Sequence, residues 1–163
     1  MILGLLSDTH DRFAAAQAAV RTLGANGAQF LLHAGDIGRE QVIDLLAGGQ
    51  AAFVWGNNDF DRAGLSAYAT QMGVNCLGVF GELELDGKKI ALTHGDDDKL
   101  VRGVLEEQRH DYLITGHTHM RHDRRNGRVR WINPGAMHRV GVKTVALLDT
   151  SKDVLHWITV GVS

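Results

Sequence analysis

Five short apolar segments along the chain each run into a cluster of polar residues. The segments are Ile2–Leu6, Phe30–Leu32, Ala51–Trp55, Lys89–Leu92 and Tyr112–Thr115. The clusters that follow them are Ser7-Asp8-Thr9-His10, Gly35-Asp36, Gly56-Asn57-Asn58-Asp59, Thr93-His94-Gly95-Asp96 and Gly116-His117-Thr118-His119. Apolar segments this short predict buried strands. Because ligands of open α/β sheets bind at the carboxyl ends of strands, the five clusters are expected to meet in one site.

The two halves of the chain differ in pattern. In the first half, helical spacing between the strands predicts helices from Phe13 to Leu23, over Glu40–Leu46 and over Ala63–Met72. This alternation indicates βαβ units and a parallel sheet, hence an α/β fold. The second half is rich in strands. Hairpin turns are expected at Asp86-Gly87 and Asn126-Gly127, with a third hairpin from Val145–Leu148 and Val154–Ile158.

Composition excludes several classes of protein. Hydrophobic residues make up 44% of the 163 residues and the net charge is −2, which argues against disorder, nucleic-acid binding and attachment to an anionic membrane. No apolar stretch predicts a membrane span. The single cysteine, Cys76, permits no internal disulfide and favours a reducing compartment. No signal peptide is recognised, so a cytoplasmic location is expected; exposed hairpin edges allow a dimer.

The polar clusters contain the ligand types of a metal site. Carboxylates, an amide and imidazoles, with no thiolate, suit borderline divalent metals. Seven candidates exceed the three protein ligands of a mononuclear catalytic zinc site, whereas two metals sharing one carboxylate would use all of them. These candidates are Asp8, His10, Asp36, Asn57, His94, His117 and His119.

Each candidate taken singly also has a structural interpretation. An Asp before a turn commonly caps a helix or forms an Asx turn, and Asp96, Asp97 or Asp98 would cap a helix near Lys99–Gln108. A histidine at a strand end is commonly satisfied by a backbone group. His33 is open between that role and a hydrogen bond to a metal-binding carboxylate. It is the recurrence at five strand ends that favours a dinuclear site.

The ordered motifs Asp8-Thr9-His10, Gly35-Asp36, Gly56-Asn57, His94-Gly95 and Gly116-His117-Thr118-His119 resemble the calcineurin-like metallophosphoesterase signature. The small size and the segment Ile132-Asn133-Pro134-Gly135 resemble its compact bacterial and archaeal phosphodiesterase subgroup. The resemblance covers nearly the whole chain. It implies that residues 1–163 form a single metallophosphoesterase domain, a four-layer αββα sandwich in which two mixed sheets pack face to face with helices outside.

The resemblance also implies a ligand set and a reaction. It places Asp8, His10 and His119 on one metal, places Asn57, His94 and His117 on the other, and makes Asp36 the bridge. Manganese is the first expectation for both ions, with Fe, Zn, Co or Ni as alternatives. The reaction expected is hydrolysis of a small phosphate ester by in-line attack of a metal-bridging hydroxide.

One departure from the family pattern bears on the substrate. Asn58 stands where relatives carry His or Cys, beside the acid Asp59, at the positions assigned a catalytic role. An amide donates hydrogen bonds but delivers no proton at neutral pH, which favours diesters or good leaving groups. Arg12 and Arg139 are candidates for binding the phosphate, and His138 is expected near the pocket.

The sequence therefore predicts a metal-dependent phosphoric ester hydrolase, first of all a phosphodiesterase. Two alternatives stay open at this point. One is a non-catalytic scaffold on the same fold, and the other is a nucleotide monoesterase or dinucleoside polyphosphate hydrolase. The natural substrate is not readable from the sequence.

Overall fold

The computed structural model describes residues 1–161, which form two sheets with helices on their outer faces. The first sheet has six strands, in the spatial order β11 (Val154–Thr159), β10 (Thr144–Asp149), β1 (Ile2–Leu6), β2 (Phe30–His33), β3 (Ala51–Phe53) and β4 (Asn75–Cys76). The second has five, in the order β5 (Phe80–Leu85), β6 (Lys88–Thr93), β7 (Tyr112–Ile114), β9 (Val129–Asn133) and β8 (His122–Asn126).

Both sheets are mixed. In the first, β1, β2, β3 and β4 are parallel neighbours, whereas β10 and β11 run antiparallel to their partners. In the second, β6, β7 and β9 are parallel, and β5 and β8 are antiparallel edges. The parallel strands of each sheet therefore direct their carboxyl ends the same way.

The core lies between the sheets. Leu3, Leu5, Leu32 and Ile114 are fully buried members of one cluster to which strands of both sheets contribute. The alternate residues of β1 lie on the other face of the sheet, where Leu6 packs in a separate cluster with residues of α1. A strand buried on both faces reads as a continuous apolar run, which explains the composition of Ile2–Leu6.

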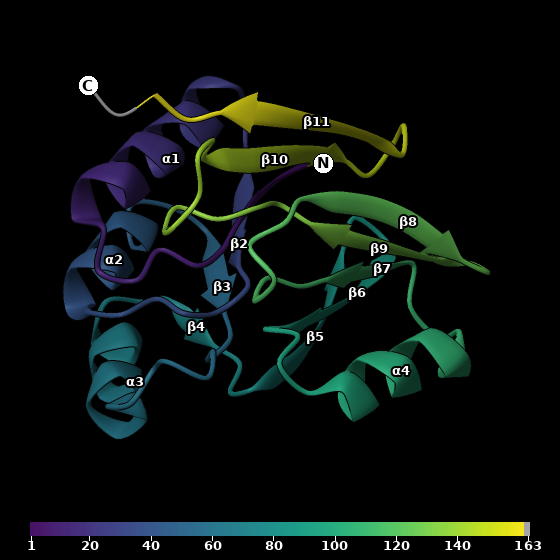
Figure 1. Cartoon of the computed structure of the whole chain (residues 1–163), viewed down its shortest axis with the longest axis horizontal. Coiled ribbons are helices and arrows are strands. Elements are labelled where there is room, and N and C mark those ends of the chain that lie inside the picture. The colour runs from purple at the N-terminus through teal and green to yellow at the C-terminus, as the bar shows by residue number, and fades with distance from the viewer. Residues whose placement is uncertain (162–163) are drawn as a thin grey trace.

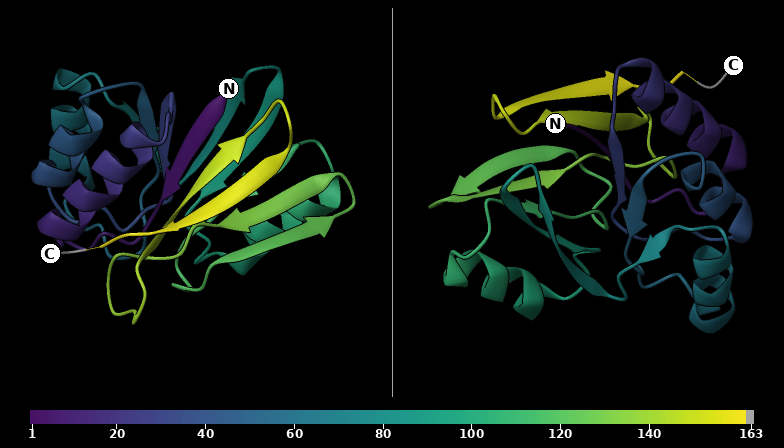
Figure 2. Two further views of the ribbon diagram at one scale, coloured as in Figure 1. Left: turned by 90° about the horizontal axis from the view of Figure 1, so that it is seen from above. Right: turned by 180° about the vertical axis from the view of Figure 1, so that it is seen from behind.

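Helices complete four layers. Figures 1 and 2 show α1 (Phe13–Ala25), α2 (Glu40–Leu46) and α3 (Arg62–Gln71) against the outer face of the first sheet. The last helix, α4 (Asp98–Glu107), packs Val101, Val104 and Leu105 onto the second sheet. This arrangement confirms the predicted αββα sandwich.

The turns show where local prediction succeeded and where it slipped. Asp86 and Gly87 both have positive φ, at 54° and 70°, as a type I′ turn between β5 and β6 requires. The second hairpin pairs Asn126 with Val129, so its loop is Gly127-Arg128 and not the predicted Asn126-Gly127. Gly127 at φ 58° takes the first central position, which type II′ turns reserve for glycine.

Candidate metal site

The predicted polar clusters lie in adjoining loops at the carboxyl ends of the strands. The loop after β1 is joined to the loop after β2, because the backbone N–H of Asp8 donates to Gly35 O at 3.0 Å and that of His10 to Asp36 O at 3.0 Å. In the second sheet, Gly116 N–H donates to His94 O at 2.9 Å. His117 N–H then reaches across the sheets to Asp8 Oδ2 at 3.1 Å.

The backbone of these loops is unusual. Five of the seven predicted ligands have left-handed φ values between 44° and 65°, namely Asp8, His10, Asp36, His117 and His119. Asp and His tolerate this region better than most residues, yet each instance costs about 1–3 kcal/mol. Such strain gathered in one place marks a functional site, because surrounding structure must maintain it.

Asp8 lies at the bottom of the site with no exposed side-chain surface. Its Oδ2 accepts from Ser7 Oγ at 2.5 Å and from the His117 backbone. Its buried Oδ1 has no hydrogen-bond partner in the described part of the chain, although His119 Nε2 lies 3.2 Å away. Burial raises the pKa of Asp8, and the hydrogen bond from Ser7 opposes this rise.

Asp36 is surrounded by nitrogen atoms. Its Oδ2 lies 3.1 Å from His10 Nε2 and 3.3 Å from His94 Nε2, and it accepts from Asn58 Nδ2 at 2.8 Å. The Asn58 backbone N–H donates to the other oxygen at 2.9 Å. Burial alone would raise the pKa of Asp36, but these nitrogen partners outweigh burial and hold it below its usual value, so the group stays ionised.

His94 is held in one orientation by its Nδ1, which lies 2.8 Å from the carbonyl oxygen of Ala34 and donates to it. Its Nε2 is buried and faces both carboxylates. Burial opposes protonation, but Asp36 and the Ala34 carbonyl outweigh it and raise the pKa of His94 to about 9. A cation binding at Nε2 would therefore displace a proton. The ring of His117 lies edge-on to that of His94, with centroids 5.2 Å apart.

The arrangement fits a metal centre. Potential ligand atoms of Asp8, His10 and His119 lie within 4.8 Å of one another, as do those of Asp8, Asp36 and His94. Asp8 Oδ1, His10 Nε2 and His94 Nε2 are buried without a hydrogen-bond partner among the described residues. Buried polar atoms are rarely left so, and cations held by the two groups would satisfy all three. Asp8 belongs to both groups, whereas the predicted bridge Asp36 belongs to one.

The predicted residues of the Gly56–Asp59 loop differ in their contacts. Asn58 contacts Asp36, and Asn57 is exposed, with no hydrogen bond to another predicted ligand within residues 1–161. Both oxygens of buried Asp59 accept backbone N–H groups, from Gly38 at 2.9 Å and Gly56 at 2.8 Å. Asp59 thus ties the loop after β2 to the loop after β3.

Sequence reasoning missed the residue that fastens this loop on its other side. Arg62, at the start of α3, donates to the carbonyl oxygens of Gly56 at 2.7 Å and Asp59 at 3.0 Å. The only available signal was its position three residues after Asp59. His33, which the sequence left open, meets the Thr9 hydroxyl at 3.0 Å, and Thr9 donates to backbone carbonyls of the loop after β2.

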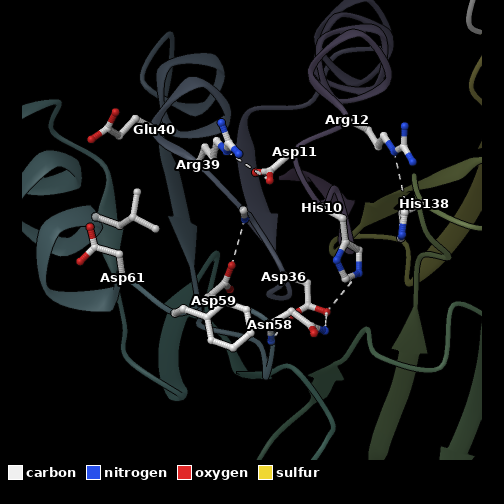
Figure 3. Close-up of a pocket in the computed structure, with 13 residues that line it drawn as sticks. His10, Asp11, Arg12, Asp36, Arg39, Glu40, Asn58, Asp59, Asp61 and His138 are labelled. Carbon is white, nitrogen blue, oxygen red and sulfur yellow. Dashed lines mark hydrogen bonds and ion pairs between the residues drawn. The ribbon is translucent and has the colours of Figure 1, made fainter.

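A cavity of about 720 Å³ opens beside the candidate metal site. His10 and Asp36 lie on its inner side, and Arg12 and His138 face one another at its edge, with Arg12 Nε 3.2 Å from His138 Nδ1 (Figure 3). A smaller neighbouring pocket is lined by His117, His119, His138 and Arg139. Both predicted phosphate-binding arginines therefore lie at the rim of the site. Phe60, which sequence reasoning did not single out, also lines the large cavity.

These features define a metallophosphoesterase site on an αββα sandwich, and comparison with known proteins agrees. A profile of the calcineurin-like phosphoesterase superfamily domain matches residues 1–153, and the chain belongs to this family. It is 29% identical over 157 residues to phosphodiesterase MJ0936 of Methanocaldococcus jannaschii, covering 93% of this chain and 95% of that protein.

Solved structures share the fold. A structure described as a novel archaeal phosphodiesterase aligns with a TM-score of 0.90 at 28% identity, over 98% of this chain and 99% of its own. YfcE, a phosphoesterase from E. coli, aligns with a TM-score of 0.68 at 18% identity, over 99% of this chain and all of its own. Vps29 of Entamoeba histolytica, solved with zinc, gives 0.70 at 20% identity, over 99% and 100%. The last two likenesses concern the fold alone.

Proposed function

We propose that residues 1–163 act as one domain that hydrolyses phosphodiesters with the help of two divalent cations. One observation carries this proposal: within residues 1–161, three buried ligand atoms, on Asp8, His10 and His94, have no hydrogen-bond partner and line the space of two ligand groups that share Asp8. In a chain of the calcineurin-like family, that space is suited to metal ions. No helix within residues 1–161 has the length and apolar character needed to cross a membrane.

The proposed ligands fall into two sets. Asp8, His10 and His119 would hold one cation, and Asn57, His94 and His117 the other, with Asp36 between them. The contacts of Asp8 with both groups support a pair of adjacent sites. When bound, the two cations supply Lewis acidity to phosphoryl oxygens and lower the pKa of a water toward neutrality.

The chain's own residues set up the chemistry around that water. The nitrogen atoms around Asp36 keep it ionised, so that it offers negative charge rather than a proton. The hydrogen bond that His94 Nδ1 donates to Ala34 O fixes the His94 tautomer and leaves Nε2 as the ligand atom. Asp59 and Arg62 hold the loop that carries Asn57 and Asn58, and we propose that Asp59 acts by positioning.

Asn58 directs the choice of substrate. Its side-chain amide is committed to Asp36 at 2.8 Å, and an amide has no proton to give a departing alkoxide at neutral pH. Without a general acid, the substrate must have a good leaving group, or it must be a diester whose leaving group departs with other assistance. Arg12 and Arg139 at the rim are placed to bind phosphoryl oxygens, for which guanidinium geometry is suited.

Manganese is the proposed physiological metal, because oxygen and imidazole ligands without thiolate suit it, and Fe, Zn, Co or Ni remain alternatives. The free cysteine agrees with a cytoplasmic location. A small phosphate ester is the expected partner, without nucleic acid.

The test combines metal analysis with kinetics. Purified protein is stripped of metal, reloaded with Mn²⁺ and assayed with bis(p-nitrophenyl) phosphate, while metal per chain is measured. We expect a ratio near two, and we expect Asp36→Asn to abolish turnover. Glu106→Gln, an exposed acid on α4, is the matched control and should behave as wild type. A folded protein that takes up no metal and shows no turnover with Mn, Co, Ni or Zn would instead support a scaffold.

A further inference from the structure

Phe60 is an exposed aromatic side chain beside the candidate active site. It is 87% exposed, the most exposed of the large hydrophobic residues within the described part of the chain. It lines the 720 Å³ cavity together with His10 and Asp36, two of the proposed ligands. A substituent that extends from a phosphate at the metal site into this cavity would therefore lie beside this ring.

The ring stands on a rigid support. The preceding residue, Asp59, is buried and accepts two backbone hydrogen bonds, and Arg62 binds the carbonyl oxygens of Gly56 and Asp59. Asp61, the following residue, caps α3 by accepting from Gly64 N–H at 3.1 Å. Because hydrogen bonds hold the backbone on both sides of Phe60, little further conformational entropy of this loop is lost when a ligand contacts the ring.

Apart from exposed Glu40, the acidic side chains that line the cavity are engaged by other groups, and this favours an uncharged group beside Phe60. The acids Asp59 and Asp61 are engaged by backbone N–H groups, and Asp11 pairs with Arg39 at 3.3 Å, as Figure 3 shows. Leu65 supplies a second apolar wall. A cavity of this volume lies within the range of about 300–1,000 Å³ that is usual for small-molecule sites.

We propose that Phe60 is a specificity-determining residue on which a planar aromatic substituent of the phosphate ester stacks. This inference rests on the proposed function, since it assumes that the phosphate is held at the metal site. The shared chemistry is a flat π-face, which both a nucleobase and a simple aryl group present. Stacking of a base on an aromatic side chain contributes enough to change affinity by about 10-fold.

Phosphonates test this without turnover, because they carry no ester bond to be hydrolysed. Calorimetry on the Mn²⁺-loaded protein compares methylphosphonate, phenylphosphonate, cyclohexylphosphonate and a thymidine 5′-phosphonate. We expect phenylphosphonate to bind about 10-fold more tightly than methylphosphonate, and cyclohexylphosphonate to gain less because it is not planar. If the thymidine compound binds more tightly than phenylphosphonate, the substituent is a nucleoside. If the two bind equally tightly, it is a simple aryl group.

Variants locate the effect. Phe60→Ala should remove the preference for phenyl over methyl while leaving methylphosphonate affinity unchanged, and Phe60→Tyr should retain the preference. Val79→Ala, at another exposed apolar side chain, is the control and should change nothing. A preference that survives in Phe60→Ala, or is absent from wild type, overturns the inference. Failure of every phosphonate to bind the metal-loaded protein would instead count against the proposed function.

Discussion

Acidification should destabilise this protein through His33, a buried residue on β2. Burial lowers the pKa of the His33 imidazole to about 3, against 6.5 for an ordinary histidine. Its Nε2 donates to the Thr9 hydroxyl, which in turn donates to a carbonyl of the loop after β2. His33 is therefore protonated below about pH 6.5 in the unfolded chain, but only below about pH 3 in the folded chain.

The sign and size follow from linkage. Because the folded pKa is depressed, stability is present above the unfolded value and is lost as pH falls from 6.5 toward 3. Where one proton is bound on unfolding, the free energy of unfolding changes by about 1.4 kcal/mol per pH unit. Between pH 7 and pH 4.5, His33 alone should remove roughly 2–3 kcal/mol from the free energy of unfolding.

The assay is urea unfolding of the metal-free protein in EDTA, followed by tryptophan fluorescence from pH 7 to pH 4.5. His33→Gln is the comparison, because its amide retains a donor for Thr9 and does not titrate. Titrating groups that do not interact with His33 are common to both proteins and cancel in the difference. Wild type should lose stability more steeply by the stated amount. Parallel curves for the two proteins would refute the assignment of a depressed pKa to His33.

Three further predictions concern packing and charge. Gly56→Ala places a methyl group against the Asp36 carboxylate and backbone, so we expect at least a 100-fold loss of Mn²⁺ affinity by calorimetry with the helical content kept. Gly103→Ala, in α4 with open space around it, should stabilise the protein by about 1 kcal/mol and raise Tm by a few degrees in a thermal melt. Arg130→Ala leaves Asp123 and Asp153 without their shared guanidinium; because both carboxylates are partly exposed and Asp153 keeps Arg125, chemical unfolding should show a loss of about 1–2 kcal/mol with turnover at low temperature unchanged.

Periodicity predicted the elements well where a segment carried its own signal. The strands that precede Asp8, Asp36 and His94 and the helix α2 occur where apolar spacing placed them. The two-residue strand β4 was not anticipated, because its pairing comes from β3 rather than from its own composition. The Gly127-Arg128 turn differs by one residue from expectation, since strand register and not the turn dipeptide decides which residues face one another.

The candidate site was likewise predictable in part from the sequence, and the rest depends on how the loops pack. Spacing identified which strand ends carry ligand-type residues, and the structure gathers five of the seven candidates into two ligand groups that share Asp8, with the His117 ring beside that of His94. Spacing does not say how neighbouring residues in a loop orient. The relation of Asn57 and Asn58 to Asp36, and the engagement of Asp59 by two backbone groups, depend on how the loops after β2 and β3 pack against each other.

That packing explains why glycine precedes a ligand in three of the motifs. A Cβ on Gly35 would lie 2.7 Å from His94 Nδ1, and one on Gly116 would lie 2.7 Å from Asp8 Oδ2. A Cβ on Gly56 would overlap Asp36. Each glycine thus makes room for a ligand that belongs to a different motif, between 20 and 108 residues away in the sequence. The motifs are interlocked parts of one site, so a chain that kept the ligands but filled these glycine positions would lose the close approach on which cation binding depends.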